Sequence, residues 1–136
     1  MGQWRGGCAC GAIRFVCEGE PALMLKCHCR DCQRASGSAF AAIAVYPKAA
    51  VTLSGEPRYF RVTGSSGAPV ERGFCSGCGN PLSIRLGAIP DIIGLHAASL
   101  DDPAIFKPAV EVYTASAHPW DVMDRATVKK PQGMKS

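Results

Sequence analysis

Seven of the eight cysteines in this 136-residue chain fall into three short groups. Thiols spaced this closely are typical of metal ligands or redox groups. The groups are Cys8-Ala9-Cys10, Cys27-His28-Cys29-Arg30-Asp31-Cys32 and Cys75-Ser76-Gly77-Cys78. A tetrahedral zinc ion lies about 2.3 Å from each of its sulfur ligands, so such neighbours suit one ion. They are poorly placed for stable disulfides with each other.

The first and last groups together supply four thiols, the number that closes a structural zinc site. Gly77 and Gly79 free the backbone to turn, so that N–H groups can point at the thiolates of the last group. Antiparallel pairing brings distant segments together, so sequence separation is no objection to one shared site. Two redox dithiols, or cysteines that are simply buried, are the alternatives.

The middle group has three sulfurs, the number of protein ligands that leaves a zinc ion one position for water or substrate. In an extended segment Cys27 and Cys29 face one side and His28 the other, and Cys32 returns from the following turn. Arg30 and Arg34 are near enough in sequence to offset the negative charge. A metal-free reactive thiol is one alternative. The other is a closed site whose fourth ligand is His28, His96, His118 or Asp31.

The remaining chemistry-bearing side chains are expected to be structural. Cys17 stands alone on a strand face and is expected in the core, where free cysteine behaves as a small hydrophobe. His96 lies in an apolar strand, and His118 is expected in a turn or at a pocket edge. Core positions are also expected for the aromatic residues Phe40, Tyr46, Tyr59, Phe60 and Trp120.

Dense glycine and proline divide the chain into short segments that predict a mainly-β fold. Apolar alternation predicts strands over residues 12–18, 23–25, 40–46, 58–62, 70–74, 82–86, 92–96 and 110–113. One or two helical turns are expected over residues 30–35, ended by Gly37. Ordered structure is expected to end near Asp124, with residues 125–136 as a flexible basic tail.

The net charge of +4 belongs to that tail, where four basic residues and no acidic ones follow Asp124. Residues 1–124 are formally neutral, and seven thiolates with two Zn²⁺ ions would bring them to about −3. This balance argues against nucleic acid as a partner. A hydrophobic content of 47% excludes a wholly disordered chain. Without a secretion signal or a membrane-spanning run, a cytoplasmic protein is expected.

The pattern resembles the glutathione-dependent formaldehyde-activating enzyme family, whose domain is shared with the centromere protein V group. The resemblance extends over residues 4–121 and places all seven clustered cysteines in register. It is carried by residues 6–15 (GGCACGAIRF), 27–40 (CHCRDCQRASGSAF) and 72–79 (RGFCSGCG).

The resemblance implies a mainly-β fold of the Mss4-like type, built of short antiparallel strands around zinc, over residues 4–124. A structural zinc would take Cys8, Cys10, Cys75 and Cys78. A catalytic zinc, the more weakly held, would take Cys27, Cys29 and Cys32.

The implied activity is that of a carbon–sulfur lyase that joins glutathione to formaldehyde or a related small aldehyde. Arg30 and Arg34 are candidates for binding the carboxylates of glutathione, or are solvated side chains. A zinc-stabilised binding module of the same fold, without catalysis, is the alternative function. No membrane partner is expected.

Overall fold

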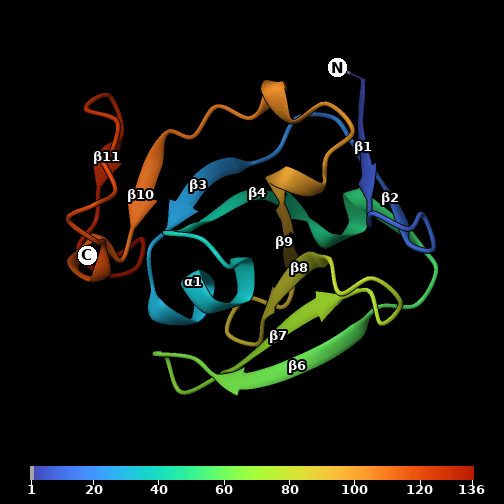
Figure 1. The fold of residues 1–136 in the computed structure, drawn as a ribbon, viewed down its shortest axis with the longest axis horizontal. Coiled ribbons are helices and arrows are strands. Elements are labelled where there is room, and N and C mark those ends of the chain that lie inside the picture. Colours follow the sequence, from blue (N-terminus) through green and yellow to red (C-terminus); the bar gives the residue numbers. More distant parts are fainter. Residues whose placement is uncertain (1) are drawn as a thin grey trace.

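Two β-sheets make up most of this computed structural model, which describes residues 2–136 (Figure 1). The smaller sheet has the strand order β1 (Gln3–Gly7), β2 (Arg14–Glu18) and β5 (Val51–Ser54). The larger sheet has eight strands, in the order β11 (Val128–Lys129), β10 (Val110–Val112), β3 (Leu23–Cys27), β4 (Ala41–Pro47), β9 (Ile92–His96), β8 (Pro81–Leu86), β7 (Pro69–Phe74) and β6 (Arg58–Thr63).

The mainly-β prediction is confirmed, and each of the eight expected strands is present. Neighbouring strands pair antiparallel, except that β10 lies parallel to both β3 and β11. Three strands were not expected: β1, β5 and β11. Strand β1 is not predicted from the sequence because its two glycines are poor strand formers. Gly6 is required there, since a Cβ atom at this position would lie 2.3 Å from the carbonyl oxygen of Ser99.

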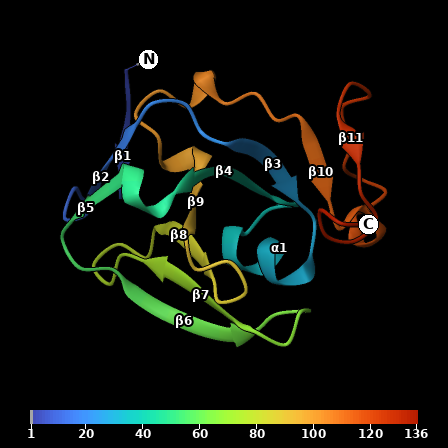
Figure 2. The same cartoon turned by 180° about the vertical axis from the view of Figure 1, so that it is seen from behind.

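The helix α1 (Arg30–Ser36) forms where the sequence predicts it, and Figures 1 and 2 show it between the β3–β4 and β7–β8 parts of the larger sheet. Cys29 caps its start, because its Sγ accepts the backbone N–H of Cys32 at 3.3 Å. Gly37 ends it in the left-handed conformation, with φ of 66°. Within residues 2–136 no helix has the length and apolar character needed to cross a membrane.

A helix of seven residues is not stable by itself, and buried Gln33 fixes it to the rest of the structure. Its amide nitrogen donates to the carbonyl oxygens of His28 at 2.6 Å and of Ser116 at 3.1 Å. Four short 3₁₀ turns complete the elements: η1 (Lys48–Ala50), η2 (Ala97–Ser99), η3 (Pro103–Ile105) and η4 (Thr114–Ser116).

Two apolar clusters form the core. The first joins the two sheets, because Phe15 and Cys17 of β2 pack with Tyr46 of β4 and Leu95 of β9. Cys17 is fully buried, as the sequence predicts. The second cluster surrounds α1 and consists of Cys27, Cys32, Ala41, Ile43, Ile84, Val110 and Val112. Two cysteines of the middle group are therefore built into the core.

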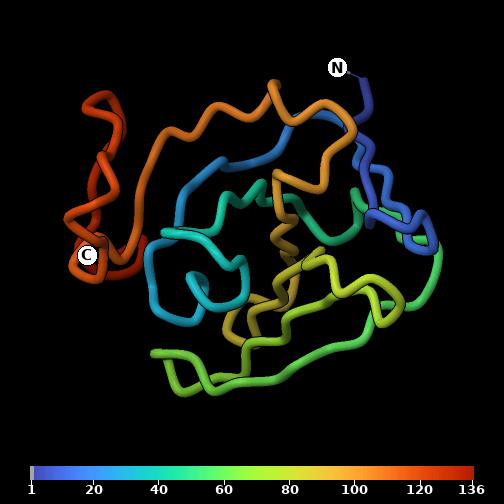
Figure 3. Tube along the Cα trace, in the orientation of Figure 1, coloured from blue at the N-terminus to red at the C-terminus, as the bar shows by residue number. Residues whose placement is uncertain are grey.

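The chain after Asp124 is attached to the larger sheet, contrary to the expectation that ordered structure ends there. Strand β11 pairs with β10, and the N–H of Tyr113 donates to the carbonyl oxygen of Gln132 at 2.7 Å. Figure 3 shows this segment beside β10, on the opposite side of the molecule from β1. Its composition is that of a solvated tail, but its backbone is paired.

A buried carboxylate explains this attachment. Glu111 of β10 is fully buried and accepts hydrogen bonds from the hydroxyl of Thr127 and from Nε2 of His28, both at 2.6 Å. Burial raises the pKa of Glu111, but these two hydrogen bonds, together with the positive charge of Lys26, outweigh burial, and the net pKa lies below its ordinary value. The C-terminal segment thus completes the partners of a buried charge.

Replacing Thr127 with valine should lower the free energy of unfolding by about 2 kcal/mol, since it removes one hydrogen bond to a buried charged group. Chemical denaturation of the metal-loaded protein measures the change. Thr52→Val, at an exposed position of β5, is the matched control and should change stability by less than about 0.5 kcal/mol. Equal stabilities for the two variants would mean that the Thr127 bond contributes nothing.

Candidate functional site

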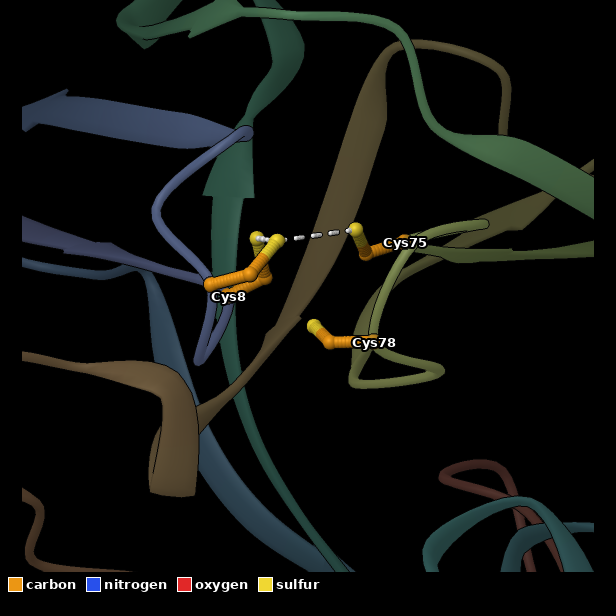
Figure 4. A group of neighbouring side chains, drawn as sticks. Cys8, Cys75 and Cys78 are labelled. Carbon is orange, nitrogen blue, oxygen red and sulfur yellow. Dashed lines mark hydrogen bonds between the residues drawn. The ribbon is translucent and has the colours of Figure 1, made fainter.

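The first and last cysteine groups meet in one cluster, which we call the four-cysteine cluster: Cys8, Cys10, Cys75 and Cys78. Figure 4 shows the sulfurs from the β1–β2 turn facing those from the β7–β8 turn. The Cys8 and Cys10 sulfurs are 3.6 Å apart, those of Cys10 and Cys75 are 3.7 Å apart, and all four lie within 4.8 Å of one another. A tetrahedral ion about 2.3 Å from each sulfur requires separations of about 3.8 Å.

The backbone of both turns supports thiolates at this cluster. The N–H of Ile13 points at Cys8 Sγ, and the N–H of Gly77 points at Cys75 Sγ, each at 3.3 Å. Gly79 completes the second turn with φ of 76°, a conformation that strains other residues. The donor set, the spacing and these N–H groups fit a tetrahedral metal ion.

The same cluster links the two sheets. Cys8 and Cys10 follow β1 of the smaller sheet, whereas Cys75 and Cys78 follow β7 of the larger one. A metal ion held here is therefore a cross-link between sheets that otherwise share the first apolar cluster.

The middle group forms the three-cysteine cluster, with Cys27 at the end of β3, Cys29 at the cap of α1 and Cys32 in its first turn. Its three sulfurs also lie within 4.8 Å of one another. Cys27 and Cys32 are buried, and Cys29 is partly exposed. All eight cysteines of the chain are free thiols. The cluster can hold a metal ion that is reached from the Cys29 side.

No fourth His, Cys, Asp or Glu joins this cluster in the part of the chain that the structure describes. His28 is fully buried and turned to Glu111, as the alternation of an extended segment predicts. His118 Nε2 lies 2.7 Å from the Gln33 side-chain oxygen. Neither His96 nor Asp31 belongs to the cluster. The end of β3 and the start of α1 thus supply three ligands from six consecutive residues, and those residues supply no fourth.

Three thiolates at this separation repel one another unless positive charge lies among them. Hydrogen bonds from the thiols of Cys27 and Cys32 lower the pKa of Cys29 to about 2. The hydrogen bond to Cys29 raises the pKa of Cys27. The cluster by itself thus favours one thiolate beside protonated partners, and a divalent cation is what lets all three ionise.

The guanidinium in contact with the cluster comes from Arg72 of β7, not from the arginines that the sequence suggested. Its two terminal nitrogens lie 3.7 and 3.6 Å from Cys32 Sγ. Arg30 instead donates to the side-chain oxygen of Gln33. Neither Arg72 nor Glu111 was expected at this site from the sequence. The sequence does carry a signal for Arg72, because it shares one face of a predicted strand with the apolar Val70 and Phe74 and is therefore expected to point toward the core.

Arg30 and Arg34 do line an open groove of about 570 Å³ on the exposed side of α1. The other lining residues are Gln33, Gly37, Ser38, Ala39, Phe40, His118, Trp120 and Asp121. His118 stacks on Trp120 with ring centroids 4.5 Å apart, so its expected place at a pocket edge is confirmed. The core position expected for Trp120 is wrong, because 70% of it is exposed. Phe60 is likewise exposed rather than buried.

Fold and clusters together define a mainly-β protein with two cysteine clusters that can each hold a metal ion. A family model described as glutathione-dependent formaldehyde-activating enzyme matches residues 3–116, and the chain belongs to this family. A solved structure of a Rhodobacter sphaeroides protein, a structural genomics target, is similar with a TM-score of 0.58. It is 18% identical, and the match covers 93% of this chain and 98% of that one. At this level of identity, the comparison shows that the two proteins share a fold.

Loss of the four-cysteine cluster should unfold the protein, whereas loss of the three-cysteine cluster should not. Cys75→Ser breaks the cross-link between sheets, and metal binding at such a site is largely folding energy. Cys29→Ser affects ligands that lie close together in sequence, so it should leave a folded chain with about half the bound metal. Circular dichroism and metal analysis measure both results. Equal unfolding of the two variants contradicts this division.

His96 generates a prediction for pH dependence. Burial, aided by the charge of Arg72, lowers its pKa to about 4 from a value of 6.5. The unfolded chain therefore binds more protons between these values, so stability is full above pH 6.5 and falls as pH decreases. Between pH 7 and pH 5.5 the free energy of unfolding should fall by about 1 kcal/mol more in this protein than in the His96→Leu variant. Urea unfolding at both pH values tests this, and parallel losses would refute it.

Proposed function

We propose that this protein joins the thiol of glutathione to formaldehyde, or to a related small aldehyde, at the three-cysteine cluster. The observation that carries the proposal is a group of three cysteine sulfurs with a partly exposed member and no fourth side-chain ligand in residues 2–136. Three protein ligands leave a metal ion one position for an outside group. Membership of the family supports glutathione and formaldehyde as that chemistry.

Zinc is the proposed metal at both clusters, because thiolate ligands in tetrahedral sets select it over harder ions. When bound, it lowers the pKa of a coordinated thiol and supplies thiolate at neutral pH. The four-cysteine cluster is proposed as structural and the three-cysteine cluster as catalytic. Free thiols at all eight cysteines are compatible with the cytoplasm, which we propose as the location.

Buried hydrogen bonds hold the cysteine ligands in place. His28 separates Cys27 from Cys29 in sequence, and its bond to Glu111 fixes the extended segment against β10. Gln33 follows Cys32 and accepts from His118 while donating to the carbonyl of His28. These contacts set the directions of the three sulfurs before any substrate arrives, which reduces the ordering needed on binding.

The groove beside α1 is the proposed place for the peptide part of glutathione. Glutathione carries two carboxylates, and Arg30 and Arg34 are the cationic groups on the groove wall. The stacked rings of His118 and Trp120 add an exposed apolar face. Because Arg30 follows Cys29 directly, the groove and the ligands are positioned by the same helix. The Gln33–His118 bond ties the two groove walls together.

The reaction itself is an addition. A lone pair of the glutathione sulfur forms the new bond to the carbonyl carbon, and the carbonyl π electrons move to the oxygen. That oxygen then takes a proton from water, which replaces the proton that the thiol gave to water on forming the thiolate. The sum is the thiol plus formaldehyde giving S-(hydroxymethyl)glutathione. Thiols add to formaldehyde readily without a catalyst, so the contribution of the protein is to supply thiolate and to orient it.

Glutathione should add a sulfur ligand to the metal of the three-cysteine cluster. X-ray absorption of the zinc-loaded protein at millimolar glutathione should show a rise in the mean number of sulfur ligands per zinc. S-methylglutathione, whose sulfur is blocked, is the matched ligand control and should produce no rise. Cys29→Ser should lose the response, and the rate of adduct formation should fall to the uncatalysed background.

An unchanged sulfur environment at millimolar glutathione would remove this mechanism. The protein would then be a zinc-stabilised binding module of the same fold, since fold alone does not determine function. Coordination is the decisive measurement because a small rate increase over the background reaction does not separate catalysis from binding.

A further inference from the structure

Arg72 approaches the three-cysteine cluster from a strand far away in the sheet. Three strands separate β7 from β3 in the sheet, since the order runs β3, β4, β9, β8 and β7. The guanidinium nevertheless contacts Cys32 Sγ through both terminal nitrogens. In Figures 1 and 2, α1 lies between these parts of the sheet. The fold thus brings a positive charge to a cluster whose ligands all come from residues 27–32.

The strand register supports this placement independently. Val70, two residues before Arg72 and on the same face of β7, packs against the apolar cluster that contains Cys27 and Cys32. On β8, Leu86 pairs with Val70 and Ile84 pairs with Arg72. Both of these β8 residues belong to, or pack against, the same apolar cluster. Glu71 points to the other face, where it pairs with Arg61. Arg72 is therefore a charged side chain on an apolar face that meets the cluster.

The guanidinium of Arg72 has donors available for a further ligand. Its Nε is buried and has no hydrogen-bond partner, and the contacts of its terminal nitrogens are to sulfur. Among residues 2–136, no carboxylate lies within ion-pair distance of it. A planar group with five N–H donors and no carboxylate partner is suited to an anion at the cluster.

The charge of the metal complex indicates which kind of fourth ligand Arg72 stabilises. A divalent ion with three thiolates carries a net charge of −1, which disfavours a second anion. A thiolate as fourth ligand brings the charge to −2, and the guanidinium returns it to −1. With a neutral ligand the complex stays at −1 and the guanidinium brings the sum to 0, but the neutral ligand itself gains no charge attraction from Arg72. The attraction is strong because the groups are partly buried and little screened by solvent.

We infer that Arg72 makes the three-cysteine cluster selective for an anionic fourth ligand, specifically a thiolate, over a neutral nitrogen or oxygen ligand. This inference rests on the proposed function only in taking the cluster as a metal centre open to a fourth ligand. Arg72 acts on the charge of the bound group, whereas Arg30 and Arg34 are assigned to distant carboxylates. It therefore applies to any small thiol.

Ligand binding to cobalt-loaded protein tests this without reference to turnover, because thiolate–cobalt bonds absorb visible light. The probes are 2-mercaptoethanol, which lacks carboxylates and so does not involve Arg30 or Arg34, and imidazole, which is neutral. Arg72→Gln should weaken binding of 2-mercaptoethanol about tenfold and leave imidazole binding within about twofold. Arg61→Gln, on the adjacent strand and exposed to solvent, is the matched control and should change neither.

Arg72→Lys retains the charge without the planar fork and should keep most of the preference for the thiol. Should Arg72→Gln fail to fold, Arg72→Met replaces it, since methionine fits the apolar face of Val70 and Ile84. Equal changes for both probes, or an unchanged preference in the uncharged variants, would overturn the inference. Binding with no adduct formation would instead count against the proposed function, so the two failures are distinguishable.

Discussion

Electrostatic repulsion between closely spaced thiolates is the constraint on which this structure depends. Seven sulfurs are gathered into two clusters, each with all its members within 4.8 Å of one another. Neither cluster can be fully ionised unless positive charge lies within it, because thiolates at this distance raise one another's pKa. Metal binding and the folded arrangement of these turns therefore support each other.

The two clusters differ in how far apart their ligands lie in the chain, and this gives them different structural effects. The four-cysteine cluster takes its ligands from turns of different sheets, so it fixes how the sheets lie on one another. The three-cysteine cluster takes its ligands from six consecutive residues at the end of β3 and the start of α1. A local cluster of this kind can gain or lose a ligand without moving the sheets.

Groups from distant strands complete the surroundings of the three-cysteine cluster. Glu111 of β10 binds His28 on the side away from the sulfurs, and its remaining oxygen is bound by Thr127 of the C-terminal segment. Arg72 of β7 contacts Cys32 from the other part of the sheet. An anchoring hydrogen bond and a neutralising charge thus reach the same six residues from elements that are adjacent to them only in the fold.

The sequence predicted eight of the eleven strands, a helix over residues 30–35 and the grouping of the cysteines, because short-range periodicity and spacing carry this information. It also placed His28 away from Cys27 and Cys29, since an extended segment alternates its side chains. It did not reveal β1, whose glycines conceal a strand, nor the attachment of residues 125–136, whose composition suits a solvated tail. Only the tertiary structure decided that Arg72 rather than Arg30 contacts the sulfurs. The physical reason is that a charge 40 residues away in sequence reaches Cys32 only when strand pairing brings β7 beside α1.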